Sequence, residues 1–69
     1  HLLYFWTVAR QGSVSKAAQT LFLSQPTVSE QIRQLEKSIG GDLFERRGKR
    51  LVLTSLGQEI LRYADDIFT

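Results

Sequence analysis

The sequence predicts a mainly α-helical domain in which three helices precede a two-stranded β-hairpin and a fourth helix. Two observations predict this order. Apolar residues recur at helical spacing in four segments, and glycine or capping residues stand at the ends of these segments. Between residues 43 and 53 the pattern changes to two short apolar runs around an Arg47-Gly48-Lys49 turn. A chain of 69 residues is long enough for one small domain.

The first two helices are short. Residues 2–11 carry apolar side chains on one helical face, and Gly12 is a typical helix stop. Either Ser13 or Ser15 supplies the N-cap of the second helix. The apolar face of this helix consists of Val14, Ala17, Ala18 and Leu21. Its two small alanines allow another helix to cross at close distance.

The third helix, residues 24–39, has the most regular pattern. Its apolar residues fall within about 60° of one another at 100° per residue, which predicts a narrow buried stripe. The stripe consists of Val28, Ile32, Leu35 and Ile39. Ser24 is the expected N-cap, Pro26 fits the first turn, and Gly40-Gly41 ends the helix.

The short connection around Leu23 makes the second and third helices a helix-turn-helix pattern. Many such turns contain a glycine, but Phe22 or Leu23 occupies its place here. This difference predicts a turn that is more tightly packed and slightly longer. The hairpin, residues 43–53, then acts as a wing, so the predicted fold is a winged helix-turn-helix.

The exposed start of the third helix suits an anion, because free N–H groups and the positive end of the helix dipole lie at Ser24, Gln25 and Thr27. In helix-turn-helix proteins this end enters the DNA major groove. Gln25 and Gln34 are candidates to read adenine, and Glu30 can accept from a cytosine amine.

Other outward positions on the same helix suit the remaining parts of a DNA duplex. The methyl group of Thr27 can meet a thymine methyl group. Ser29 and Arg33 are candidate ligands of backbone phosphates. Each of these features alone is also ordinary capping or an ordinary solvated face, but their combination in this order favours DNA binding.

The net charge is only +2, but the basic residues are clustered. Four of the nine lie within five positions of the hairpin: Arg46, Arg47, Lys49 and Arg50. Such a cluster predicts a local anion contact and not a polycationic tail. On the wing, these residues are expected to lie along the DNA backbone or to reach into the minor groove.

Thr54 is the expected N-cap of the last helix, and the apolar residues beyond it predict a partner helix. A seam with a spacing near 3.5 residues consists of Ile60, Ala64 and Ile67, and Leu61 and Phe68 lie beside it. We expect its later part to run past the core of the domain and to contact a second copy. The alternative is that this part frays in isolation. Asp65 and Asp66 are expected to be solvated or paired with basic residues of the partner.

The segments "SQPTVS", "QI", "LE" and "LF" at residues 24–29, 31–32, 35–36 and 43–44 are spaced as in a known family. With Gly40 and Arg46, they make the chain resemble the amino-terminal domain of LysR-type transcriptional regulators. The segments "HLLYFWTV" and "RYADDIF" are similar to the branch that contains the regulator of sodium/proton antiporter genes.

The resemblance implies a winged helix-turn-helix over residues 1–54, a linker helix for dimerisation that begins in residues 55–69, and an effector-binding domain after residue 69. It also implies a bacterial cytoplasmic protein that binds promoter DNA as a dimer or tetramer. The positions that match DNA contacts in the family are Gln25, Pro26, Thr27, Ser29, Glu30, Gln34 and Arg46. Two positions depart from the family pattern: Glu30 is often basic or polar there, and Ser55 is commonly proline.

Other classes of function find little support. The chain has no cysteine, so it has no disulfide or thiolate metal site, and its single histidine is residue 1. No carboxylate pair or glycine-rich phosphate loop predicts an enzyme, a cofactor or a metal site. The apolar opening is too short to span a membrane, and the missing initiator methionine suggests a fragment of a longer protein. The remaining rival is a winged helix that binds protein, against which the basic wing argues.

Overall fold

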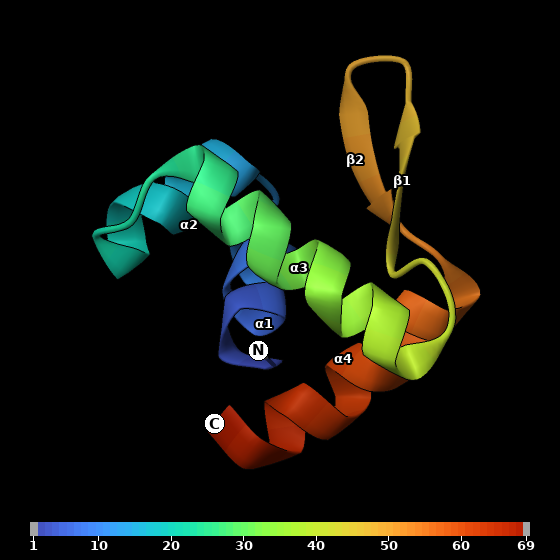
Figure 1. Ribbon diagram of the computed structural model, residues 1–69. Helices are drawn as coiled ribbons and strands as arrows, with labels where there is room; N and C mark the ends of the chain where they lie inside the picture. Colours follow the sequence, from blue (N-terminus) through green and yellow to red (C-terminus); the bar gives the residue numbers. More distant parts are fainter. Residues whose placement is uncertain (1, 69) are drawn as a thin grey trace.

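The computed structural model describes residues 2–68, and these form helices and strands in the predicted order (Figure 1). The elements are α1 (Leu2–Gln11), α2 (Val14–Leu21), α3 (Gln25–Ile39), β1 (Phe44–Arg47), β2 (Arg50–Leu53) and α4 (Ser55–Phe68). Figure 1 shows α3 across the centre, the hairpin standing above its C-terminal half, and α4 running back towards α1. The predicted winged helix-turn-helix is confirmed. Within residues 2–68, no helix combines the length and apolar character needed to cross a bilayer.

The core lies where the first three helices meet. Val8 of α1 and Val28 of α3 are fully buried, and they pack with Ala17 and Ala18 of α2. The alanines therefore have the predicted role at the crossing of α2 and α3. Burial of this apolar surface is the main stabilising contribution in a domain of this size.

Only the first half of the predicted stripe on α3 is buried. Val28 and Ile32 lie in the core, Leu35 is half-buried, and Ile39 is exposed. The helix has 15 residues and is about 22 Å long. The helices α1 and α2 have only 10 and 8 residues, so the last turn of α3 extends beyond them. The prediction that Ile39 belongs to the buried stripe is therefore wrong.

The turn between α2 and α3 has the left-handed backbone conformation that glycine usually supplies. Phe22 has φ 58° and ψ 40°, and it is 94% exposed. Leu23 turns inward against the core, and its N–H donates to the Ala18 carbonyl at 3.0 Å. The connection has the ordinary length for this motif. The prediction of a longer turn is therefore wrong, and of the two residues considered for the glycine position, Leu23 is the one that packs against the core.

Three hydroxyl side chains cap the helices. Ser13, not Ser15, caps α2, because its Oγ accepts from the Lys16 N–H at 3.2 Å. Ser24 caps α3, and Thr54 caps α4 by accepting from the Gly57 N–H at 2.9 Å. Each cap satisfies one of the N–H groups that a helix start leaves free.

The wing is the antiparallel pair of β1 and β2. Its loop is one residue shorter than predicted, because Arg47 belongs to β1 and pairs with Arg50. Gly48 has φ 63° at the first loop position, where two-residue turns of type II′ favour glycine. The ring centroid of Phe44 lies 5.3 Å from that of Phe5, so the base of the wing packs against α1.

The second half of α4 packs along α1 instead of extending past the core. Ala64 is fully buried, and the ring centroid of Phe68 lies 5.3 Å from that of Trp6. The carboxylate of Asp65 accepts from Trp6 Nε1 at 2.8 Å and from Arg10 Nε at 3.0 Å. The predictions of an overhanging helix and of a solvated or partner-bound Asp65 are therefore wrong. The cause is a pairing of residues 59 positions apart, which periodicity along one helix does not reveal.

Candidate nucleic-acid interface

The start and outer side of α3 present polar side chains to solvent. The following predicted site residues are all exposed: Ser24, Gln25, Pro26, Thr27, Ser29, Glu30, Arg33 and Gln34. They become available because Val28 and Ile32 turn the opposite side of the helix into the core. The structure thus leaves every α3 candidate accessible to a ligand.

Two of these residues already bind each other. The Ser24 and Thr27 hydroxyl oxygens lie 2.8 Å apart, and Ser24 Oγ also accepts from the Thr27 N–H at 3.3 Å. Their hydroxyl groups therefore serve the cap of α3. Within residues 2–68 the Gln25 side chain makes no hydrogen bond, and the Thr27 methyl group takes no part in the cap, so both are better suited to contact a base edge.

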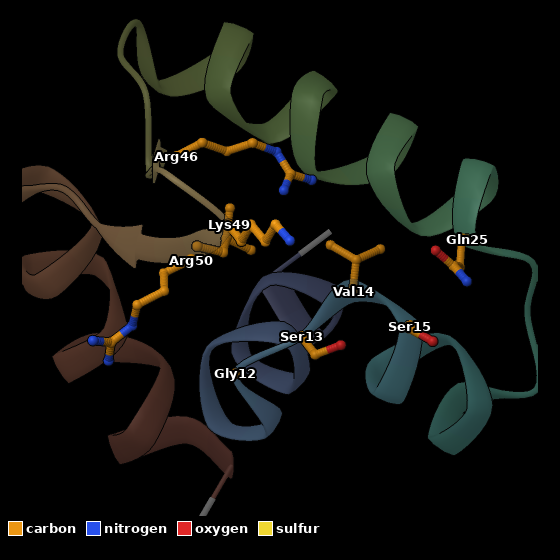
Figure 2. Close-up of a pocket in the computed structure, with 9 residues that line it drawn as sticks. Gly12, Ser13, Val14, Ser15, Gln25, Arg46, Lys49 and Arg50 are labelled. Atoms are coloured by element: carbon orange, nitrogen blue, oxygen red, sulfur yellow. The ribbon is translucent and has the colours of Figure 1, made fainter.

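An open groove of about 510 Å³ lies between the wing and the starts of α2 and α3 (Figure 2). We call it the inner groove, and its lining residues are Gly12, Ser13, Val14, Ser15, Gln25, Arg46, Lys49, Arg50 and Leu51. Figure 2 shows Arg46 and Lys49 pointing from the wing towards this space, with Gln25 on the opposite side. The inner groove is thus lined by a candidate for base recognition, Gln25, and by two cationic side chains, Arg46 and Lys49.

The contribution of α2 to the groove was missed by sequence reasoning. The sequence predicts a capping role for Ser13 or Ser15, but both stand at the groove wall together with the first turn of α2. The start of a helix favours an anion through its N–H groups and dipole. Two serines at the start of the first helix of the helix-turn-helix are the signal for it in the sequence.

The four basic residues of the wing do not form one surface. Alternation along the strands places Arg46 on the same face as Phe44 and Leu51, which are half-buried and pack against the core. Arg47 and Arg50 are cross-strand partners on the other face. Although Arg50 borders the inner groove, its side chain points away from Gln25 in Figure 2.

Two of the candidate arginines have acidic neighbours. Arg33 forms an ion pair with Glu30 at 3.6 Å, and Arg47 binds Glu45 at 3.1 Å. Exposed pairs of this kind are weak, about 0–1 kcal/mol, so a phosphate can compete for the arginine. Among residues 2–68, the side chains of Arg46, Lys49 and Arg50 have no acidic partner within salt-bridge distance. These three are the wing cations most available to an anion.

The chemistry of this surface suits recognition of a polyanion. It combines amide, hydroxyl and cationic side chains on short, capped elements, and its groove is open. In the described part of the chain, no three His, Cys, Asp or Glu residues are grouped as metal ligands. The single histidine, His1, lies outside the described residues.

The predicted dimer seam on α4 is divided between two environments. Ala64 and Phe68 face α1, as described above, so they are occupied within the chain. Ile60 and Leu61 are half-buried, whereas Ile67 is 62% exposed. Tyr63, which sequence reasoning did not select, is 68% exposed and lies one turn before Ile67. The assignment of this seam to a dimer contact stays a prediction.

The fold and the site together define a winged helix-turn-helix domain with a polar and basic surface around the start of its third helix. Residues 1–58 match the family model described as bacterial regulatory helix-turn-helix protein, lysR family. The chain belongs to this family, which confirms the resemblance inferred from the sequence.

Among curated proteins, the chain is 48% identical over 69 residues to the transcriptional activator protein NhaR of Escherichia coli, covering all of this chain and 23% of that protein. It is 54% identical over 63 residues to the RuBisCO operon transcriptional regulator of Allochromatium vinosum, covering 91% of this chain and 21% of that protein. The chain thus spans less than a quarter of the length of these relatives. Since both identities are similar, the branch within the family stays a prediction.

Solved structures of the family have the same fold. The BenM DBD in complex with catB site 1 DNA has a TM-score of 0.91 and 37% identity, covering 97% of this chain and 75% of that chain. The CbnR DBD in complex with DNA has a TM-score of 0.87 and 38% identity, covering 96% of this chain and 76% of that chain.

Proposed function

We propose that this chain is a DNA-binding domain that recognises promoter DNA for a bacterial lysR-family transcriptional regulator. In this proposal α3 enters the major groove and the wing contacts the backbone or the minor groove. The observation that carries the proposal is the inner groove, where α2, α3 and the wing meet with Gln25 on one side and Arg46 and Lys49 on the other. The likeness to the BenM and CbnR domains, which were solved with DNA, supports it.

Within this interface the side chains have different tasks. Gln25, Gln34 and Glu30 read base edges, and the methyl group of Thr27 and the ring of Pro26 make apolar contacts in the groove. The remaining candidates hold phosphates: Ser24 through the helix start, and Ser29, Arg33, Arg46, Arg47, Lys49 and Arg50 through their side chains. We expect Arg46 and Lys49 to contribute more than Arg47, which is already paired with Glu45.

The intact regulator extends this proposal beyond the domain. We propose that residues 1–54 form the DNA-binding unit, that residues 55–69 begin a linker helix, and that two or four copies assemble. An effector is sensed by a domain outside this chain, and the protein acts in the cytoplasm. The domain itself has no catalytic role.

Selection from a random duplex library at near-physiological salt tests the function directly. We expect enrichment of one half-site, or of two inverted half-sites about one helical turn or a multiple of it apart. Enrichment of half-site pairs places dimerisation within these residues, whereas a single half-site places it elsewhere. Retention without enrichment would remove the base-reading roles. A folded domain that retains no duplex would instead support the winged helix that binds protein.

The variants Gln25→Ala and Arg46→Ala separate base reading from phosphate binding. Gln25→Ala should weaken binding to the selected site by about 1–3 kcal/mol and relax specificity there. Arg46→Ala should weaken binding to all sequences and lower the log–log salt slope by about 0.9. Fluorescence anisotropy titrations against selected and scrambled duplexes at several salt concentrations measure both effects. An equal loss on both duplexes for Gln25→Ala would contradict its role.

A further inference from the structure

The carboxylate of Glu36 connects the base of the wing to α3 through hydrogen bonds. Glu36 is half-buried near the end of α3, and its Oε2 accepts from the backbone N–H groups of Leu43 at 2.8 Å and Phe44 at 3.4 Å. A carboxylate suits this position, because it has lone pairs for two donors and makes stronger hydrogen bonds than a neutral group. Glu36 thus holds the residues with which the wing begins.

The same wing base is fixed from the other side. The Thr54 N–H donates to the Leu43 carbonyl at 3.0 Å, and the Thr54 hydroxyl donates to the Asp42 carbonyl at 2.6 Å. Leu43 itself is fully buried. The entry to the wing is therefore held by α3 through Glu36 and by the start of α4 through Thr54.

The tip of the wing has no comparable support. Residues 45–50 are all exposed, and each strand has four residues, which is roughly 13 Å of extended chain. A tilt of about 10° at the base would therefore move the tip by roughly 2 Å. That displacement is enough to break a hydrogen bond, whose donor–acceptor distance varies by only about 0.5 Å. The angle at the wing base thus decides where the wing cations stand.

Glu36 also borders the same cavity as two candidate phosphate ligands. An open cavity of about 250 Å³ between α3 and the wing is bordered by Glu36, by Arg33 of α3 and by Arg46 of the wing. Arg33 and Arg46 belong to different elements, so their separation depends on the joint between these elements. Glu36 forms that joint without itself being needed as a DNA ligand.

We propose that Glu36 is a positioning residue for DNA binding, which sets the wing at the angle where its cations meet phosphates while α3 reads bases. This inference rests on the proposed function. For the removal of the Glu36 carboxylate, this proposal and simple electrostatics predict opposite changes in DNA affinity. Removal of a negative charge from a DNA-binding surface should strengthen binding, whereas loss of the joint should weaken it.

The test compares the wild type with Glu36→Ala, Glu36→Gln, Arg46→Ala and the double variant Glu36→Ala/Arg46→Ala. Anisotropy titrations use the selected duplex and a scrambled duplex over a range of salt concentrations, well below each melting temperature. We expect Glu36→Ala to weaken binding to both duplexes by a similar factor and to lower the salt slope by about as much as Arg46→Ala does. The double variant should lose less than the sum of the two single losses, because both act through the wing.

Two further variants separate positioning from general damage. Glu36→Gln keeps one oxygen acceptor for the Leu43 N–H, so it should bind more tightly than Glu36→Ala. Glu59→Ala removes the same charge from an exposed position on α4 and should not weaken binding. Circular dichroism confirms that each variant is folded, and Glu36→Gln carries the test if Glu36→Ala does not fold.

Three results would overturn the inference: a folded Glu36→Ala variant that binds as tightly as the wild type, fully additive losses in the double variant, or a Glu36→Gln variant that binds no more tightly than a folded Glu36→Ala variant. In these cases the wild type and Arg46→Ala still show the wing contact, so the proposed function stands. If the wild-type domain binds no duplex at all, the proposed function and this inference fail together.

Discussion

At the scale of single residues, Asp65 shows how a surface carboxylate can become part of the fold. The pKa of Asp65 lies below its ordinary value of 3.8, because the Arg10 guanidinium and the Trp6 indole donate hydrogen bonds to the carboxylate and the Arg10 charge attracts it. A lowered pKa in the folded state means that the ionised form stabilises the fold. This stabilisation is present above the unfolded pKa and is lost as the pH falls through the folded pKa.

The first prediction concerns Asp65→Asn. The variant should be less stable than the wild type at neutral pH, and the difference should shrink as the pH falls below about 4. Urea unfolding between pH 2 and 7 measures this. Asp66→Asn is the matched control, because it removes the same charge at the next, exposed position. A difference between wild type and Asp65→Asn that is constant over this pH range would contradict the assignment.

The second prediction concerns Phe22, whose left-handed backbone is unfavourable for a side chain with a Cβ. Phe22→Gly should stabilise the domain by about 1 kcal/mol, because the exposed ring loses almost no burial. The melting temperature should therefore rise by about 4–8 °C. Phe22→Ala removes the ring but keeps the Cβ, so it should bring no such gain. Thermal melts that rank alanine at or above glycine would argue against backbone strain at this position.

At the scale of elements, the start of α4 and the base of the wing form one tightly packed joint. Gly57 of α4 lies against the base of the wing with no room for a side chain. A Cβ added there would stand 2.1 Å from the Leu43 carbonyl oxygen and 3.0 Å from Leu53 Cδ2. Backbone atoms cannot move aside as easily as a flexible side chain. The glycine is therefore required by the approach of two elements, not by its own dihedral angles.

The third prediction follows from this contact. Gly57→Ala should gain about 1 kcal/mol of helix propensity, but the clash with Leu43 should cost more. We expect a net loss of about 2 kcal/mol or more, measured by urea unfolding. Gln58→Ala, at the exposed neighbouring position, should change stability by less than about 0.5 kcal/mol. A Gly57→Ala variant that is more stable than the wild type would mean that the wing base can move away from α4.

At the scale of the whole molecule, α4 has an inner side that closes the domain against α1 and an outer side that is open. Ala64 belongs to the inner side, whereas Tyr63 and Ile67 expose apolar surface on the outer side. These two residues are one helical turn apart, so their side chains are neighbours. We propose that they make the contact between two copies, with Ile60 and Leu61 at its edge.

The fourth prediction concerns this contact. Ile67→Asp should lower self-association while the domain stays folded, because it places a charge in an apolar contact between copies. Analytical ultracentrifugation over a range of concentrations measures the change. Gln58→Asp, at an exposed position on the opposite side of α4, is the control. If the wild-type domain is monomeric at every concentration tested, dimerisation does not depend on this surface alone.

Much of the architecture was predictable because it depends on local rules. Helical spacing, the caps at Ser24 and Thr54, and glycines at helix and hairpin turns act over a few residues, so they can be read along the chain. The outward side of α3 followed from the position of Val28 and Ile32 for the same reason. The inner groove could not be read in this way, since it joins three separated segments.

By itself, therefore, the sequence determined the order of the elements, the exposure of the candidate DNA contacts on α3 and the family. Only the tertiary structure decided that Ala64, Asp65 and Phe68 close against α1, that the wing cations lie on two faces, and that Glu36 holds the wing base. The physical reason is the separation along the chain of the residues that interact. Periodicity and capping are properties of neighbouring residues, whereas packing, cross-strand faces and joints depend on which distant segments meet.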